Sequence, residues 1–295
     1  MYMLTSQIDG SVDTFSWVWQ NQTYPITYEI RGKGAPVLLL PAFSTVSSRS
    51  EMQGLADHLS TQFQVVAIDW LGFGQSARPA VDYCPALYQQ FLQDFVQARF
   101  TTPISVIAAG HAAGYVMHLA HQSPGVWSKI VLVAPTWRGP LPTMGVPIAI
   151  ANAIRQLVRS PVLGQFLYQL NTHPTFLRWM YRRHVYTDAT RLTPTLMAQK
   201  WRNTQMPGGR FAPAAFVTGG LDPVRQRADF LSTFQALSAP TLVIIGEQTP
   251  PKSRAEMEVL AHVAGVEVHR IAGTLGMHEE HATALAAIVL PFLQK

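Results

Sequence analysis

The fold is decided by residues 106–115, which read VIAAGHAAGY from Val106 to Tyr115. The apolar run that ends at Ala109 is typical of a buried strand. Glycines at positions 110 and 114 allow a sharp turn and close packing of a strand against a helix. We therefore expect a strand, a tight turn and a helix in immediate succession, with the chemistry of any site concentrated at the turn.

Other apolar runs alternate with helical patterns along the chain. Alternating residues on both sides of Gln20–Gln22 predict an opening hairpin. Strands followed by helices imply right-handed crossovers and a doubly wound, mostly parallel sheet of α/β class. The expected strands after the hairpin are residues 36–40, 64–69, 129–135, 241–247 and 267–273, and the expected closing helix is 282–294.

Composition limits the class of protein. The chain has 295 residues, of which 48% are hydrophobic, enough for one large α/β domain with an insertion. The single cysteine, Cys84, cannot form an intramolecular disulfide. No apolar run approaches the roughly 18 residues of a membrane span. Met1–Asp9 lacks the basic and apolar regions of a secretory signal. We expect a cytoplasmic protein, either soluble or attached to a membrane surface.

Two motifs resemble the α/β-hydrolase superfamily, in its esterase- and epoxide-hydrolase-like branch. Residues 69–76 read DWLGFGQS, an Asp-x-x-Gly-x-Gly-x-Ser pattern after a strand, and a Gly-His-x-x-Gly turn begins at Gly110. The similarity covers most of residues 24–136 and 240–295. It implies a hydrolase-type core formed by 1–136 and 240–295, with residues 137–239 inserted as a helical lid.

The resemblance also identifies the positions of the catalytic triad. In this family a Ser in the strand–helix turn attacks a carbonyl, a His moves the protons, and an acid orients the His. The corresponding positions in this sequence hold Ala112, Leu275 and Thr249. None of these side chains can perform the family's chemistry. We therefore expect a pseudo-hydrolase, a non-catalytic protein on the α/β-hydrolase fold.

In this family the groups that bind the oxygen of the substrate's carbonyl are backbone N–H groups. Substitution of a side chain does not remove them. The resemblance implies an oxyanion hole formed by the N–H groups of Phe43 and Ala113. Ser44 and His111 would lie beside the same pocket, with His111 as a hydrogen-bonded structural residue. Such a pocket suits an apolar or acyl-bearing small molecule.

An active enzyme is the alternative hypothesis. An esterase- or lipase-like hydrolase could use Ser44 as a relocated nucleophile, or His278 with a neighbouring Glu as a base. Against this, Ser44 lies in a hydroxyl-rich loop that could simply cap the next helix. His278 and His281 have the spacing His-x-x-His, which is not the i, i+4 pair of a zinc motif. They fit an exposed helix start. We expect no metal and no nucleotide cofactor.

The inserted lid is strongly basic. Residues 137–210 contain ten Lys or Arg and one acid, Asp188, so this segment carries +9 and the rest of the chain −4. Basic helices with aromatic and aliphatic partners are typical of membrane-surface elements. A protein partner, or a lid whose arginines are merely solvated, is the other interpretation. Nucleic acid is disfavoured because no binding motif accompanies the charge. The basic patch comprises Arg155, Arg159, Arg178, Arg182 and Arg183.

One more basic pair follows the strand at residues 241–247. Lys252 and Arg254 come directly after Pro250 and Pro251, which stiffen the turn. The two cations either hold an acidic group at the rim of the pocket or are exposed charges at a helix start.

Overall fold

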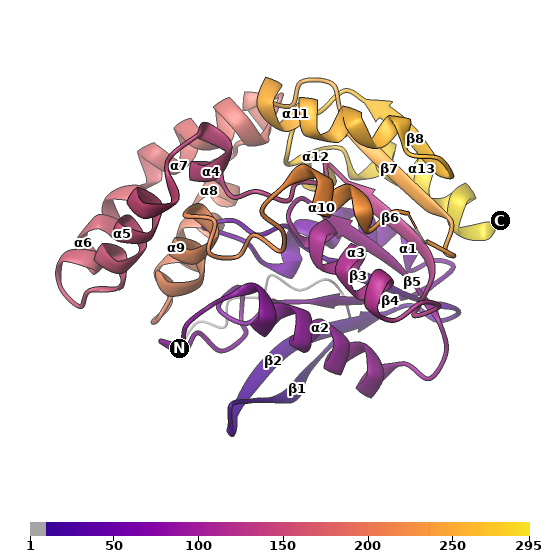
Figure 1. The fold of residues 1–295 in the computed structure, drawn as a ribbon, viewed down its shortest axis with the longest axis horizontal. Coiled ribbons are helices and arrows are strands. Elements are labelled where there is room, and N and C mark those ends of the chain that lie inside the picture. Colours follow the sequence, from indigo (N-terminus) through magenta and orange to yellow (C-terminus); the bar gives the residue numbers. More distant parts are fainter. Residues whose placement is uncertain (1–9, 236) are drawn as a thin grey trace.

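Eight strands form one sheet in the order β1-β2-β4-β3-β5-β6-β7-β8 in a computed structural model, which describes residues 10–235 and 237–295 (Figure 1). The expectation about Met1–Asp9 lies outside these residues. The strands are β1 (Ser11–Trp19), β2 (Gln22–Arg31), β3 (Pro36–Leu40), β4 (Gln64–Ile68), β5 (Ile104–Ala109), β6 (Trp127–Val133), β7 (Thr241–Gly246) and β8 (Val266–Ile271).

The predicted opening hairpin is confirmed. β1 and β2 pair antiparallel, and the two residues between them, Gln20 and Asn21, have φ values of 48° and 61°. Positive φ at both turn residues matches the twist of a two-residue hairpin. β2 also pairs antiparallel with β4, and all the remaining neighbours are parallel. The α/β fold class with a mostly parallel sheet is therefore confirmed.

Helices cover both faces of the sheet. α1 (Gln53–Leu59) packs against α13 (Ala282–Gln294), and α2 (Pro85–Arg99) packs against α3 (Ala112–Gln122) on the other face (Figure 1). Every residue of β5 and β7 is buried, as expected for central parallel strands that are covered on both sides. Burial of these apolar strands positions the loops at their carboxyl ends.

The segment between β6 and β7 is helical, and we call residues 137–239 the lid. Figure 1 shows α5, α6 and α7 at the end of the molecule opposite β8 and the C-terminus. The lid helices are α4 (Pro140–Met144), α5 (Ile148–Arg159), α6 (Leu163–Asn171), α7 (Pro174–Met180), η2 (Tyr181–Val185), η3 (Ala189–Arg191), α8 (Pro194–Thr204), α9 (Phe211–Val217) and α10 (Arg227–Ser232).

Four short helices complete the core: η1 (Arg49–Met52), α11 (Pro251–Glu258), η4 (Val259–His262) and α12 (Met277–Glu280). Across the described ranges, none of the helices has the length and hydropathy needed to cross a bilayer.

Candidate functional site

The turn after β5 is made by Gly110. Its φ is +53°, His111 is already right-handed at φ −69°, and Ala112 is the first residue of α3. A positive φ favours glycine because a Cβ is unfavourable there. The strained residue is thus Gly110. The sequence motif had suggested Ala112, two positions later. Ala112 is fully buried at the start of the helix.

Little space surrounds the tip of this turn. A Cβ placed on Gly110 would lie 3.1 Å from the Cβ of Ala42 and 3.9 Å from the Oγ1 of Thr136. Ala42 belongs to the loop after β3, and Thr136 follows β6. The turn is therefore enclosed by the carboxyl ends of its two neighbouring strands.

The backbone donors differ in part from the expected pair. The N–H of Ala113 donates to the carbonyl of Gly110 at 3.2 Å, so this group is engaged within the first helical turn. By contrast, the N–H groups of Phe43 and His111 donate to no acceptor among the described residues. The expected role of the Phe43 N–H as an oxyanion donor is compatible with this geometry. The expected role of the Ala113 N–H is corrected, because His111 is the residue that follows the turn and its N–H is the one without an acceptor.

Aromatic rings fill the space around Phe43. Its ring centroid lies 4.9 Å from that of Trp70, 5.0 Å from Tyr88 and 5.5 Å from Tyr115. Phe216 of the lid stacks on it at 6.4 Å, and Phe43 is only 3% exposed. The neighbourhood of the turn is therefore apolar and closely packed.

His111 joins the turn to the lid segment between α9 and α10. Its Nε2 lies 2.8 Å from the carbonyl oxygen of Leu221, which can only accept, so Nε2 carries the proton. Tyr115 donates its hydroxyl to the same oxygen at 2.6 Å. Burial lowers the pKa of His111 to about 4. The imidazole is thus neutral and acts as a structural donor, as the sequence analysis had favoured.

Asp222 is a residue that sequence reasoning missed. One carboxylate oxygen, Oδ1, accepts from the N–H of Gly139 at 2.7 Å and lies 3.6 Å from His111 Nε2. Burial raises the pKa of Asp222 to about 7. Its only signal in the sequence is its place between Gly219-Gly220-Leu221 and Pro223, in the connection between α9 and α10.

Thr249 and Leu275 stand where the sequence resemblance led us to expect the acid and the histidine of a triad. Thr249 follows β7 and is 4% exposed, and its Oγ1 has no hydrogen-bond partner among the described residues. Leu275 is partly buried and packs against the hydrophobic core. Neither side chain is a carboxylate or an imidazole.

Residues 43–49, which we call the serine loop, are held by hydrogen bonds within the loop and its flanks. Ser44 Oγ accepts from the N–H of Val46 at 3.2 Å, Ser47 donates to the carbonyl of Ala42, and Ser48 Oγ lies 2.7 Å from Ser50 Oγ. The expected capping role is wrong, because no side chain caps η1. These hydroxyls instead shape the loop, and within the described residues no hydrogen bond joins Ser44 to a histidine.

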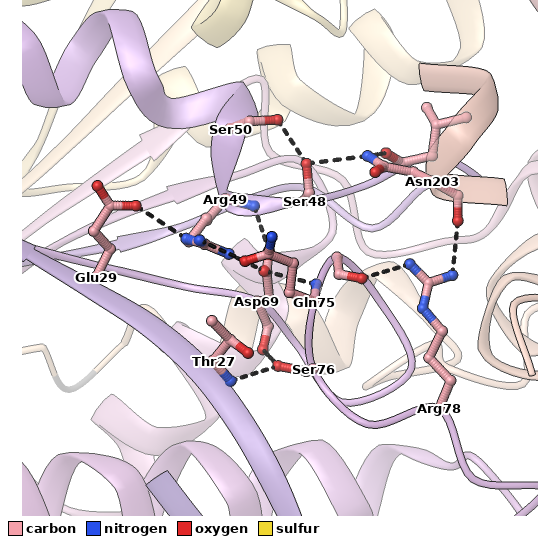
Figure 2. Close-up of polar contacts among 12 residues, drawn as sticks. Thr27, Glu29, Ser48, Arg49, Ser50, Asp69, Gln75, Ser76, Arg78 and Asn203 are labelled. Carbon is pink, nitrogen blue, oxygen red and sulfur yellow. Dashed lines mark hydrogen bonds and ion pairs between the residues drawn. The ribbon is translucent and has the colours of Figure 1, made fainter. Parts of the chain in front are cut away.

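A buried arginine explains the DWLGFGQS motif. Figure 2 shows Arg49 between Glu29 and Asp69, with its Nε 3.1 Å from Glu29. Asp69 also accepts from the backbone N–H of Arg49 at 2.6 Å and of Gln75 at 2.9 Å. Because all three charged side chains are nearly fully buried, the motif serves to hold the serine loop in place.

The same network reaches the lid. Asn203 of α8 donates to Ser48 Oγ at 3.3 Å, and Arg78 donates to the carbonyls of Asn203 and Gly74 at 2.9 and 2.7 Å (Figure 2). Two core loops therefore bind α8 by direct hydrogen bonds.

His278 belongs to a second buried cluster. Its Nε2 lies 3.4 Å from Glu51, and Lys200 of α8 pairs with Glu51 at 3.4 Å and with Glu279 at 2.7 Å. The expectation of a solvated helix start is wrong, because His278 is only 3% exposed and Glu280 2%. Hydrophobic packing of α12 against α1 and η1 draws these groups inside, where they pair with the lid.

Three of the five patch arginines donate hydrogen bonds within the protein. Arg155 donates to Asn152 at 3.2 Å, Arg159 to the carbonyl of Val81 at 2.8 Å and Arg178 to that of Leu192 at 2.9 Å. Arg182 and Arg183 are exposed in η2. The patch therefore combines anchored and outward-facing charges.

Comparison with known proteins agrees with this geometry. The chain matches the sequence profile of the α/β hydrolase fold over residues 35–274. It therefore belongs to the α/β-hydrolase fold family.

Curated relatives match only in part. An uncharacterised protein of Mycobacterium bovis is 28% identical over 111 residues, which is 38% of this chain and 32% of that protein. A 2-hydroxy-6-oxo-6-(2'-aminophenyl)hexa-2,4-dienoic acid hydrolase of Metapseudomonas resinovorans is 30% identical over 94 residues, 30% of this chain and 32% of the enzyme. The matched stretches span about a third of the length of each relative.

Solved structures match over nearly the whole chain. The haloalkane dehalogenase DatA of Agrobacterium tumefaciens has a TM-score of 0.74 at 18% identity, covering 97% of both chains. A bromoperoxidase of Bacillus anthracis has a TM-score of 0.73 at 18% identity, covering 97% of this chain and all of the other. At such identities the likeness shows the fold alone.

Proposed function

We propose that this chain does not hydrolyse esters through a nucleophile in the turn and that it docks on an anionic membrane surface through its lid. Gly110 supports the first part. If the nucleophile position is the strained residue after β5, this protein has a hydrogen atom there. Whether position 110 or 112 is chosen, no side chain can attack a carbonyl.

The outer surface of the lid supports the proposed docking on a membrane. On α5, Ile150, Ile154 and Leu157 are spaced as one helical face, and on α6 so are Leu163, Phe166 and Leu170. All are exposed, and Val162 between the helices is 85% exposed. Large apolar surfaces of this kind mark interaction sites. We call this set, with Ile148, Phe176 and Trp179, the lid face.

The charge of the lid favours an anionic lipid surface over other occupants. Asp188 is the one acid in residues 137–210, and the exposed Arg182 and Arg183 lie three and four residues after Trp179 in the chain. Each basic residue near an anionic bilayer contributes about 1 kcal/mol, and aromatic and aliphatic side chains add insertion into the headgroup region. The net negative remainder of the chain would be repelled, which favours docking with the lid toward the membrane.

Vesicle binding tests this proposal. Phosphatidylcholine vesicles with and without phosphatidylserine are sedimented with the protein. We expect binding to the anionic vesicles and loss of most of it in the double variant Phe166→Ala, Leu170→Ala. Val18→Ala is the matched control, because Val18 is 58% exposed but lies on the β1–β2 hairpin. Equal losses in both variants, or no binding to anionic vesicles, would refute docking through the lid face.

One observation favours a second candidate function, the binding of a carbonyl-bearing ligand beside the turn. The N–H groups of Phe43 and His111 lack acceptors among the described residues, so they could donate to such a group. An active esterase is less well supported, because Ser44 and His278 are each engaged in separate structural contacts.

A further inference from the structure

We infer that a groove between α4 and α11 binds a small organic anion, with its apolar part against Pro142 and Ala255 and its anionic head between Arg138 and Lys252. The groove has a volume of about 370 Å3, within the range of small-molecule sites. Its lining includes none of the residues that form the lid face. The inference is therefore independent of membrane docking.

Trp137 lines the groove and carries an indole N–H without a partner among the described residues. It is 2% exposed and stacks on Phe230 with ring centroids 6.1 Å apart, so its position is fixed. Its indole N–H is buried and has no hydrogen-bond partner among the described residues. A buried donor without a partner is costly unless something binds to it. Pro142 and Ala255 add apolar contacts to the lining.

The positive charges of the groove are not neutralised. Arg138 lies over the Trp137 ring at 4.4 Å and donates to the carbonyl of Arg225 at 3.0 Å. Lys252 donates to the carbonyl of Met144 at 3.2 Å. Both acceptors are neutral, so each cation keeps its charge and further N–H groups for a ligand.

The acidic side chains near Arg138 and Lys252 do not neutralise the positive charges of these two residues. Glu256 also lines the groove, but its two oxygens bind Arg227 at 2.7 Å each. Asp222 is close enough to Arg138 to interact electrostatically, yet the two form no ion pair, and burial raises the pKa of Asp222 to about 7. The groove therefore presents an excess of positive charge, which complements an anion.

The inner end of the groove adjoins the turn at Gly110. Thr136 lines the groove, its N–H donates to the carbonyl of Gly110 at 3.1 Å, and its Oγ1 lies beside the tip of the turn. Lys252, in contrast, is exposed to solvent. A ligand held by its anionic head at Arg138 and Lys252 would extend from the surface toward the turn.

The loop after β7 supplies an internal control. Pro250 and Pro251 start α11 so that Lys252 reaches the groove. Arg254, two residues later, donates instead to the carbonyl of Glu247 at 2.8 Å and pairs with Glu258 at 3.4 Å. The two cations predicted at the rim thus separate into one groove residue and one residue outside it.

Calorimetric titration with 1-naphthoate and its uncharged analogue 1-naphthamide tests the inference on the full chain. We expect naphthoate to bind about tenfold more tightly than naphthamide. Arg138→Gln and Lys252→Gln should each weaken naphthoate binding by about tenfold and leave the weak binding of naphthamide unchanged. Arg254→Gln, which removes an equally charged neighbour, should change neither affinity.

Three results would overturn the inference: equal affinity for the two probes, no naphthoate binding at millimolar concentration, or an Arg254→Gln effect as large as that of Lys252→Gln. Both groove substitutions are at surface positions, and circular dichroism verifies that each variant is folded. Vesicle binding by the same variants separates failure of this inference from failure of membrane docking.

Discussion

Gly110 determines what the turn after β5 can do. A residue with φ near +53° would normally present its side chain above the sheet, and glycine presents none. The two unpaired N–H groups next to it, on Phe43 and His111, depend on backbone geometry and persist without a side chain. At the scale of single residues, the turn offers two backbone N–H groups without acceptors among the described residues and, at Gly110 and Ala112, no side chain with a nucleophilic atom.

Replacing Gly110 by serine tests this arrangement. The new Cβ would lie 3.1 Å from Ala42 in a left-handed conformation, so we expect Gly110→Ser to lower the free energy of unfolding by about 1–2 kcal/mol. Ester hydrolysis should stay absent, because Thr249 and Leu275 supply no acid or base. Urea denaturation and a p-nitrophenyl acetate assay measure the two effects. Unchanged stability would show that the turn is not strained.

Asp222 and His111 should affect stability with opposite dependence on pH. His111, with its pKa lowered to about 4, binds fewer protons folded than unfolded between about pH 4 and 6.5, so its contribution rises with pH. Asp222, with its pKa raised to about 7, binds more protons folded than unfolded between about pH 4 and 7, so its contribution falls with pH.

The variant Asp222→Asn removes the contribution to stability that falls as the pH rises. We expect its stability, relative to the parent protein, to increase from pH 4 to pH 7, with a limit of about 4 kcal/mol. Thermal unfolding at several pH values measures this difference, with Asp57→Asn as an exposed control. A constant difference across this range would contradict the raised pKa of Asp222.

At the scale of elements, α8 is joined to the core by buried ion pairs and hydrogen bonds. Lys200 links it to Glu51 of η1 and Glu279 of α12, and Asn203 links it to the serine loop. In addition, Glu280 of α12 accepts from Thr187 N–H and Asp188 N–H at 2.9 and 2.7 Å. The segment that contains His278, the base considered only for the alternative of an active enzyme, therefore contacts the lid.

Lys200→Met should be strongly destabilising. It leaves Glu51 and Glu279 without their cation in a buried site, and such losses typically cost about 3–5 kcal/mol. Lys295→Met is the control, because Lys295 pairs with Glu267 on the surface and should cost less than about 1 kcal/mol. Chemical denaturation compares the two. Similar small effects would mean that the Lys200 cluster does not hold the lid.

At the scale of the whole molecule, the basic lid and the mildly acidic remainder form opposite ends of a charge gradient. Binding to anionic vesicles should therefore weaken steeply with salt, because the Debye length falls from about 10 Å at 0.1 M to about 3 Å at 1 M. The variant Arg182→Gln, Arg183→Gln should have a smaller salt dependence than the parent protein, as measured by sedimentation. An identical salt dependence would exclude these arginines from the contact.

Sequence patterns predicted the architecture well, because strand burial and hairpin chemistry are local. The β1–β2 hairpin at Gln20 and Asn21 and the closing helix α13 lie as expected. The site was harder to predict. The turn lies at Gly110 rather than Ala112 because the end of β5 depends on pairing with its neighbours. Asp222 and the buried state of His278 depend on packing between lid and core, which no local pattern encodes.

The proposal that the turn has no nucleophile is tested most simply by measuring turnover of p-nitrophenyl esters of several acyl lengths by the pure protein. We expect no hydrolysis above the buffer rate, and no labelling by a fluorophosphonate, because neither Gly110 nor Ala112 has a nucleophilic atom. Turnover that is abolished by Ser44→Ala would contradict this expectation and show that the chemistry had moved to the serine loop.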